Sequence, residues 1–224
     1  MSEEETSLIK RASELNNQGT RLIVQGELGR ATAVFQSALA VMKNASAPVD
    51  NQGLGEVVDH AQPFCAFRAL VDDRERMPSN GCSVHGIPFV LESSLIPNHD
   101  IALPLYSAVI LFNLGLSLHG ETLMGSESSL RRVTHIYRMS LQILENVSPM
   151  CPSAIVVAIA ALNNKAAIHF ELCQYNESKR CWAELSQLFE SAQTVMHATL
   201  DAKAMERIFM NFHMANFPSA AGAA

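Results

Sequence analysis

Two segments near the start of the chain, Leu15-Asn-Asn-Gln-Gly19-Thr-Arg-Leu22 and Ala31-Thr-Ala-Val-Phe35-Gln-Ser-Ala38, carry a pattern that returns twice later in the 224-residue sequence. Their apolar residues recur every three or four positions, which is typical of amphipathic helices. Gly26 and Gly29 bracket the turn between the segments. We therefore predict two helices over residues 7–43. The Ser-x-x-Glu pattern of Ser2 and Glu5 predicts a capping box at the start of the first helix.

The second copy of the pattern has Leu111, Leu114, Gly115 and Leu118, followed by Val133, Tyr137 and Ser140. The third copy has Leu162, Lys165, Ala166 and His169, followed by Ser178, Trp182 and Leu185. In the first and third copies, 12 positions separate the small residue of the first helix from that of the second, whereas the second copy has 18. The second copy therefore has a loop that is longer by six residues.

Small residues at these positions allow two helices to approach closely, while a large residue such as Phe35 fills the space beside them. A glycine inside a helix lowers helix stability by about 1 kcal/mol relative to alanine, and close packing of a second helix against Gly19 would explain its presence there. The pattern resembles the tetratricopeptide repeat (TPR), a helix pair of about 34 residues. The resemblance implies a mainly all-α fold, a right-handed solenoid of about three antiparallel TPR-like helix pairs. Gly19, Gly115 and Ala166 are 96 and 51 residues apart, so the array is not contiguous, and a generic helical bundle is the alternative.

The texture changes between Ala47 and Pro104, where six of the nine prolines lie. Such spacing excludes a long helix. Two short runs, residues 64–70 and 86–91, have the composition of strands, and Pro88 would confine the second to a sheet edge. We expect either a short two-stranded β-arm or an irregular loop wrapped on the helices.

Helical periodicity resumes at Leu105 and continues to about Asn146, with a break over residues 120–126. It then covers 152–197, with a turn near Gln174 and Pro152 in the first helical turn, and a last helix over 200–212. The predicted organisation is one folding unit with four parts. These are a first helix pair (1–46), the insertion (47–104), two further pairs with a capping helix (105–214) and a disordered tail (215–224).

Composition argues against several function classes. Sixteen basic and 22 acidic side chains give a formal charge of −6, which disfavours nucleic-acid and anionic-membrane partners. The longest wholly apolar run, 154–162, is too short to span a bilayer, and the acidic segment 2–5, with its three glutamates, is unlike a targeting peptide. We expect a cytoplasmic protein, with a nuclear location as the alternative.

Cysteines and histidines do not form a recognisable metal motif. The five cysteines include no CxxC pair, and the eight histidines are scattered singly. No phosphate loop, dinucleotide fingerprint or nucleophile elbow is present in the sequence. Arg131 and Arg132 fit a solvated helix face. We therefore predict no catalytic residues, no metal site and no cofactor.

The resemblance implies a groove lined by the first helix of each pair. The groove positions transferred from the repeat, together with one apolar neighbour, are Asn16, Asn17, Thr20, Phe112, Asn113, Leu116, Asn163, Asn164, Ala167 and Phe170. Asparagine recurs at one position as Asn17, Asn113 and Asn164. A primary amide can both donate to a peptide carbonyl and accept from a peptide N–H, so such a row could hold a backbone. Alternatively, these asparagines bond neighbouring helices inside the stack.

The function implied by the resemblance is a non-catalytic scaffold or adaptor that binds a protein or peptide segment in this groove. Family members that clamp an acidic chain end use lysine and arginine along the groove, and here only Arg11 and Lys165 lie nearby. We therefore expect a partner segment with apolar side chains, and no preference for an acidic chain end. The alternatives are a structural subunit of a larger hetero-assembly, or an enzyme whose site forms only in three dimensions.

Overall fold

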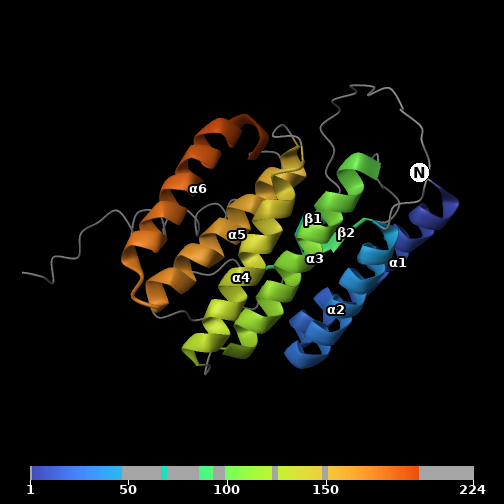
Figure 1. Ribbon diagram of the computed structural model, residues 1–224, viewed down its shortest axis with the longest axis horizontal. Helices are drawn as coiled ribbons and strands as arrows, with labels where there is room; N and C mark the ends of the chain where they lie inside the picture. The colour runs from blue at the N-terminus through green and yellow to red at the C-terminus, as the bar shows by residue number, and fades with distance from the viewer. Residues whose placement is uncertain are drawn as a thin grey trace, which may run out of the picture.

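The computed structural model describes residues 2–46, 67–69, 86–92, 99–122, 126–147 and 151–196, and structural statements below concern these residues (Figure 1). This part of the chain is mainly α. Its helices are α1 (Glu3–Gln25), α2 (Leu28–Ala45), α3 (His99–Glu121), α4 (Glu127–Leu144), α5 (Pro152–Glu171) and α6 (Tyr175–Met196). Its strands are β1 (Phe67–Ala69) and β2 (Phe89–Leu91).

The six described helices pack as sequential antiparallel pairs, α1 on α2, α3 on α4 and α5 on α6. Adjacent pairs meet through α2 against α3 and through α4 against α5, so the helices follow one another in space in chain order (Figure 1). The first helices of successive pairs also touch, α1 with α3 and α3 with α5. Each pair thus buries one face against the next.

Glycines allow the two helices within each of the first two pairs to approach closely, as the position of Gly19 inside a helix predicted. A Cβ atom at Gly19 would lie 2.6 Å from ring atoms of Phe35, and one at Gly115 would lie 2.7 Å from the ring of Tyr137. Real Cβ atoms do not approach so closely, so each aromatic ring occupies the space that glycine leaves. In the third pair, Ala166 and Trp182 are buried in one apolar cluster.

Local signals place several helix ends. The predicted capping box is present: the Ser2 backbone N–H donates to the Glu5 carboxylate at 2.7 Å, and the Glu5 N–H donates to Ser2 Oγ at 3.1 Å. Gly26 ends α1 with a left-handed backbone (φ 80°), which glycine adopts without steric cost. Pro152 occupies the first turn of α5 as predicted. Gly29, in contrast, lies inside α2.

The first helix of the second pair begins earlier than the predicted start at Leu105. Helix α3 begins at His99 and contains Pro104, so the last residues assigned to the insertion are helical. Pro104 is the sixth residue of the helix, so the hydrogen bond that a backbone N–H there would donate to the Asp100 carbonyl oxygen is missing. Ala102 and Leu105 beside it are fully buried, and this packing outweighs the local cost of the proline.

The two predicted strands pair antiparallel, with Phe67 opposite Leu91, Arg68 opposite Val90 and Ala69 opposite Phe89. Each strand is three residues long in the described part, and Pro88 lies just before β2. Strand β2 packs against α1 and α3 instead of projecting from them. It is therefore a strand lying on the helices, which combines features of both expected arrangements.

Helices α3 and α5 form the apolar centre of the described part. Residues 101–121 and 152–171 are long and apolar enough to cross a membrane by length and composition alone, and 78% of each apolar window is buried inside the protein. Central helices of a helical protein have the same property. The predicted helix over 200–212, the tail and most of the insertion lie outside the described residues.

Candidate functional site

Three asparagines from two different helix pairs hold the backbone of β2. Asn17 of α1 donates its Nδ2 to the Leu91 carbonyl oxygen at 2.7 Å and accepts the Leu91 N–H through Oδ1 at 2.8 Å. Asn113 of α3 donates to the Phe89 carbonyl oxygen at 2.8 Å and accepts the Phe89 N–H at 3.0 Å. Asn16 donates to the same Phe89 carbonyl oxygen at 3.0 Å.

The three amides act as a substitute for a neighbouring strand. In a β-strand the N–H and C=O groups of alternate residues point to opposite edges, so the groups of Phe89 and Leu91 share one edge while those of Val90 face Arg68 of β1. The asparagines cover the first edge and β1 covers the second. We call Asn16, Asn17 and Asn113 the asparagine clamp.

The clamp is itself cross-linked and mostly buried. Asn113 Nδ2 donates to Asn16 Oδ1 at 2.8 Å, which joins α3 to α1, and Asn16 Nδ2 also reaches Asn17 Oδ1 at 3.2 Å. Asn16 and Asn113 are fully buried, and Asn17 is half-buried. Because buried amides need partners, their pairing with β2 orders both the strand and the two helices.

Apolar contacts complete the seat of β2. The side chains of Phe89 and Leu91 are buried, and the ring of Phe89 lies 5.0 Å from that of Phe112 between centroids. Phe112 in turn lies 5.7 Å from the ring of Tyr137. The Tyr106 hydroxyl donates to the Glu92 carbonyl oxygen, just after the strand, at 3.3 Å. Burial, with a smaller effect of the Glu92 charge, raises the pKa of Tyr106 to about 12, so this phenol stays protonated.

The structure divides the ten predicted groove residues. Asn16, Asn17, Asn113 and Phe112 meet at β2. The remaining residues, Thr20, Leu116, Asn163, Asn164, Ala167 and Phe170, have other surroundings. Thr20 donates to the Asn17 carbonyl oxygen at 2.9 Å within α1, and Leu116 and Ala167 are buried in the core.

The third asparagine of the predicted row serves inside the helix stack. Asn164 Nδ2 donates to the Tyr137 hydroxyl of α4 at 3.2 Å, and Asn163 donates to Asn164 Oδ1 at 3.2 Å. Phe170 is 39% exposed and packs edge-on against Tyr175. Asn17 and Asn113 therefore bond an extended backbone of the same chain, whereas Asn164 bonds a neighbouring helix.

Sequence reasoning missed that the extended backbone belongs to the chain itself. The strand over 86–91 was predicted, and so was the ability of the amides to hold a backbone, but nothing in the sequence joined the two. Two features could have indicated the contact. The strand had a predicted neighbour on one edge only, and the Asn-Asn pair in the first helix would need hydrogen-bond partners once it was buried.

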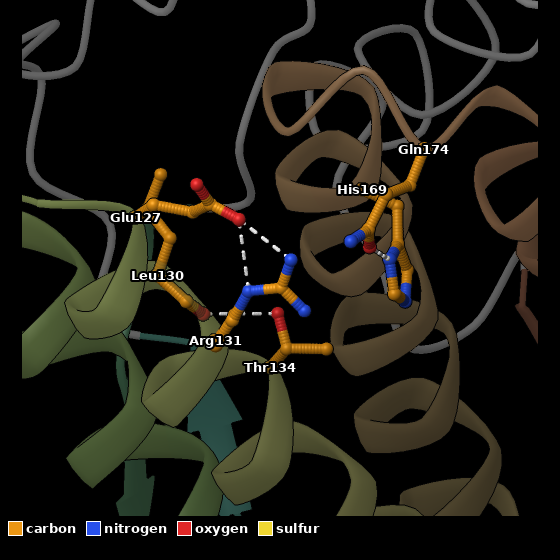
Figure 2. A network of polar contacts seen from close by, with 6 residues as sticks. All are labelled: Glu127, Leu130, Arg131, Thr134, His169 and Gln174. Carbon is orange, nitrogen blue, oxygen red and sulfur yellow. Dashed lines mark hydrogen bonds and ion pairs between the residues drawn. The ribbon is translucent and has the colours of Figure 1, made fainter.

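A cleft of about 360 Å³ lies between α4, α5 and the turn that follows α5, and its lining is mainly basic. The lining residues are Arg131, Thr134, His135, Arg138, Lys165, His169, Leu172 and Gln174. Figure 2 shows Arg131 and Thr134 on α4 across from His169 and Gln174. Arg131 makes two hydrogen bonds to one oxygen of Glu127, at 3.0 and 2.6 Å. The sequence pattern predicts this arginine only on a solvated helix face.

One buried histidine lies apart from both sites. His119 packs edge-on against the ring of Tyr137, and its Nδ1 has no hydrogen-bond partner among the described residues. Burial lowers the pKa of His119 to about 4, so its imidazole is neutral near pH 7. Burial also raises the pKa of Tyr137, while the hydrogen bond from Asn164 opposes that rise.

Within the described residues, no group of three or more His, Cys, Asp or Glu side chains is placed to hold a metal ion. Comparisons of the chain with models of protein families, with curated proteins and with solved structures found no match. We therefore infer function from the clamp and the cleft themselves.

Proposed function

We propose that the protein is a non-catalytic interaction scaffold, built as a TPR-like solenoid, that holds an extended peptide segment by its backbone between α1 and α3. The observation that carries the proposal is the asparagine clamp on the N–H and C=O groups of Phe89 and Leu91. Backbone recognition of this kind is how an added strand gains affinity at a sheet edge. Buried pockets for alternate side chains then select apolar residues, as Phe89 and Leu91 illustrate.

The proposal gives β2 the role of an internal ligand with which a partner segment competes. The chain between Ala45 and His99 is 53 residues long, so β2 can leave the clamp without any change in the connectivity of the helices. A tethered segment has an effective concentration of the order of millimolar. A partner therefore binds detectably only when it is locally concentrated or when β2 is weakened.

The test uses a fluorescein-labelled peptide with the sequence of residues 86–92, Gly-Ile-Pro-Phe-Val-Leu-Glu, and fluorescence polarisation with the full chain. We expect weak binding to the wild-type protein and tighter binding to a Phe89→Ala variant, whose own strand competes less well. Adding Asn17→Ala should abolish the gain, because Asn17 supplies both bonds to the Leu91 position. Adding Asn44→Ala, which changes an exposed asparagine, should preserve it.

Circular dichroism shows whether the Phe89→Ala variant keeps its helices, and a peptide with aspartate in place of its phenylalanine is the specificity control. Equal binding of both peptides, or binding indifferent to Asn17→Ala, would contradict the proposal. Size-exclusion chromatography addresses the rival structural-subunit function, because a monodisperse monomer argues against obligate assembly.

A further inference from the structure

The basic cleft gathers positive charge on a protein whose formal net charge is −6. Arg131, His135 and Arg138 follow one another at helical spacing on α4, and Lys165 and His169 are one turn apart on α5. Five titratable basic side chains from two helices therefore border a single hollow. Their convergence is not explained by the packing of α4 on α5, which needs apolar side chains.

Two of these charges lack a carboxylate partner within the part of the chain that the structure describes. Glu127 balances Arg131, but neither Arg138 nor Lys165 forms an ion pair with any described acidic residue. Arg138 Nη2 lies 2.7 Å from His135 Nδ1, and since a guanidinium can only donate, that nitrogen accepts and the imidazole proton is on Nε2. The charge of Lys165 opposes the burial that raises the pKa of the Cys181 thiol, and a thiol does not neutralise that charge.

The hydrogen-bonding groups at the rim are also oriented for an acceptor-rich ligand. His169 Nδ1 and Gln174 Oε1 are 2.7 Å apart (Figure 2). With the amide oxygen accepting from His169, the NH₂ group of Gln174 remains a donor. Arginine forks, a lysine and an amide NH₂ together offer more donors than the two oxygens of one carboxylate can accept.

We propose that this cleft binds a phosphate monoester. A dianion balances the charges of Arg138 and Lys165, which have no ion-pair partner among the described residues, and its three terminal oxygens match the donors of both helices. The volume of about 360 Å³ lies at the small end of small-ligand sites, which fits a phosphoryl group with a short attached portion. The cleft is separate from the asparagine clamp, so this inference does not depend on the proposed peptide groove.

Isothermal titration calorimetry of the full chain with O-phospho-L-serine tests the proposal, with serine as the uncharged control ligand. The double variant Arg131→Gln/Arg138→Gln removes two exposed cleft arginines. The matched variant Arg132→Gln/Arg180→Gln removes two exposed arginines that do not line the cleft, with the same change in net charge. We expect the cleft variant to lose about tenfold or more in affinity, as for loss of charge-assisted hydrogen bonds, and the matched variant to lose less than about twofold.

A phosphoserine peptide and a triglutamate peptide identify the source and the chemistry of the ligand. If the phosphoserine peptide binds more tightly than O-phospho-L-serine, the phosphoryl group belongs to a partner protein. If the two bind equally tightly, the ligand is a small solute. Triglutamate binding as tightly as the monoester, equal losses in the two double variants, or no binding of any phosphorylated ligand would each overturn the proposal.

Discussion

Replacing Asn113 by alanine removes the central member of the asparagine clamp. Three hydrogen bonds disappear: the one accepted from the Phe89 N–H at 3.0 Å, and those donated to the Phe89 carbonyl oxygen and to Asn16 Oδ1, both at 2.8 Å. The Phe89 carbonyl oxygen keeps Asn16 as a donor. The Phe89 N–H and Asn16 Oδ1 lose these partners inside the protein.

Each buried polar group that loses its partner costs about 1–3 kcal/mol, so two such groups predict a loss of about 3 kcal/mol in the free energy of unfolding. Urea unfolding followed by circular dichroism at constant m-value measures that loss. An Asn113→Leu variant keeps the branching at Cγ without the polar atoms, and it should lose a similar amount. Asn44→Ala, at an exposed position, should change the free energy of unfolding by less than about 0.5 kcal/mol.

A double-mutant cycle with Asn16→Ala isolates the bond between the two asparagines. Because the two side chains are in direct contact, we expect a coupling energy of about 1 kcal/mol. A stability of Asn113→Leu equal to that of the wild type would refute the reasoning, since it would mean that the clamp contributes packing alone. A coupling energy near zero would show that α1 and α3 are not joined through these amides.

Three further predictions concern stability. Gly19→Ala should lower the free energy of unfolding by about 1–3 kcal/mol, because its added Cβ would overpack against Phe35. Gly29→Ala, whose added Cβ meets its nearest neighbour at 3.6 Å, should leave that free energy unchanged or raise it by about 0.5 kcal/mol. Urea unfolding midpoints distinguish the two variants. The pKa of His119 in the folded protein is about 4, below its ordinary value of 6.5. As the pH falls, the unfolded chain therefore binds a proton at a higher pH than the folded protein does. The free energy of unfolding consequently decreases between about pH 6.5 and pH 4. His119→Leu should remove about 3 kcal/mol of that pH dependence, measured as the difference in unfolding free energy between pH 7 and pH 4. Cys173 has a left-handed backbone (φ 56°), so Cys173→Gly should raise the thermal midpoint by relieving about 1 kcal/mol of strain; a lower midpoint would contradict this.

Local patterns predicted most of the described helices and strands. The spacing around Gly19 and Phe35 identified a close helix crossing, and Ser2 with Glu5 identified a helix start. Such features depend on residues within one or two helical turns, or on small and large residues at matched positions. The start of α3 was misplaced because Pro104 is a local signal, whereas the burial of Leu105 that outweighs it is a tertiary effect.

The sequence by itself determined the helix pairs, the short strands and the presence of amides able to hold a backbone. Only the tertiary structure decided what those amides hold: Asn17 and Asn113 bind β2 of the same chain, while Asn164 bonds Tyr137. It also brought Arg138 of α4 and Lys165 of α5 to one cleft. The physical reason is that helical periodicity is a local property, whereas the partner of a polar side chain depends on which distant segment the packing places beside it.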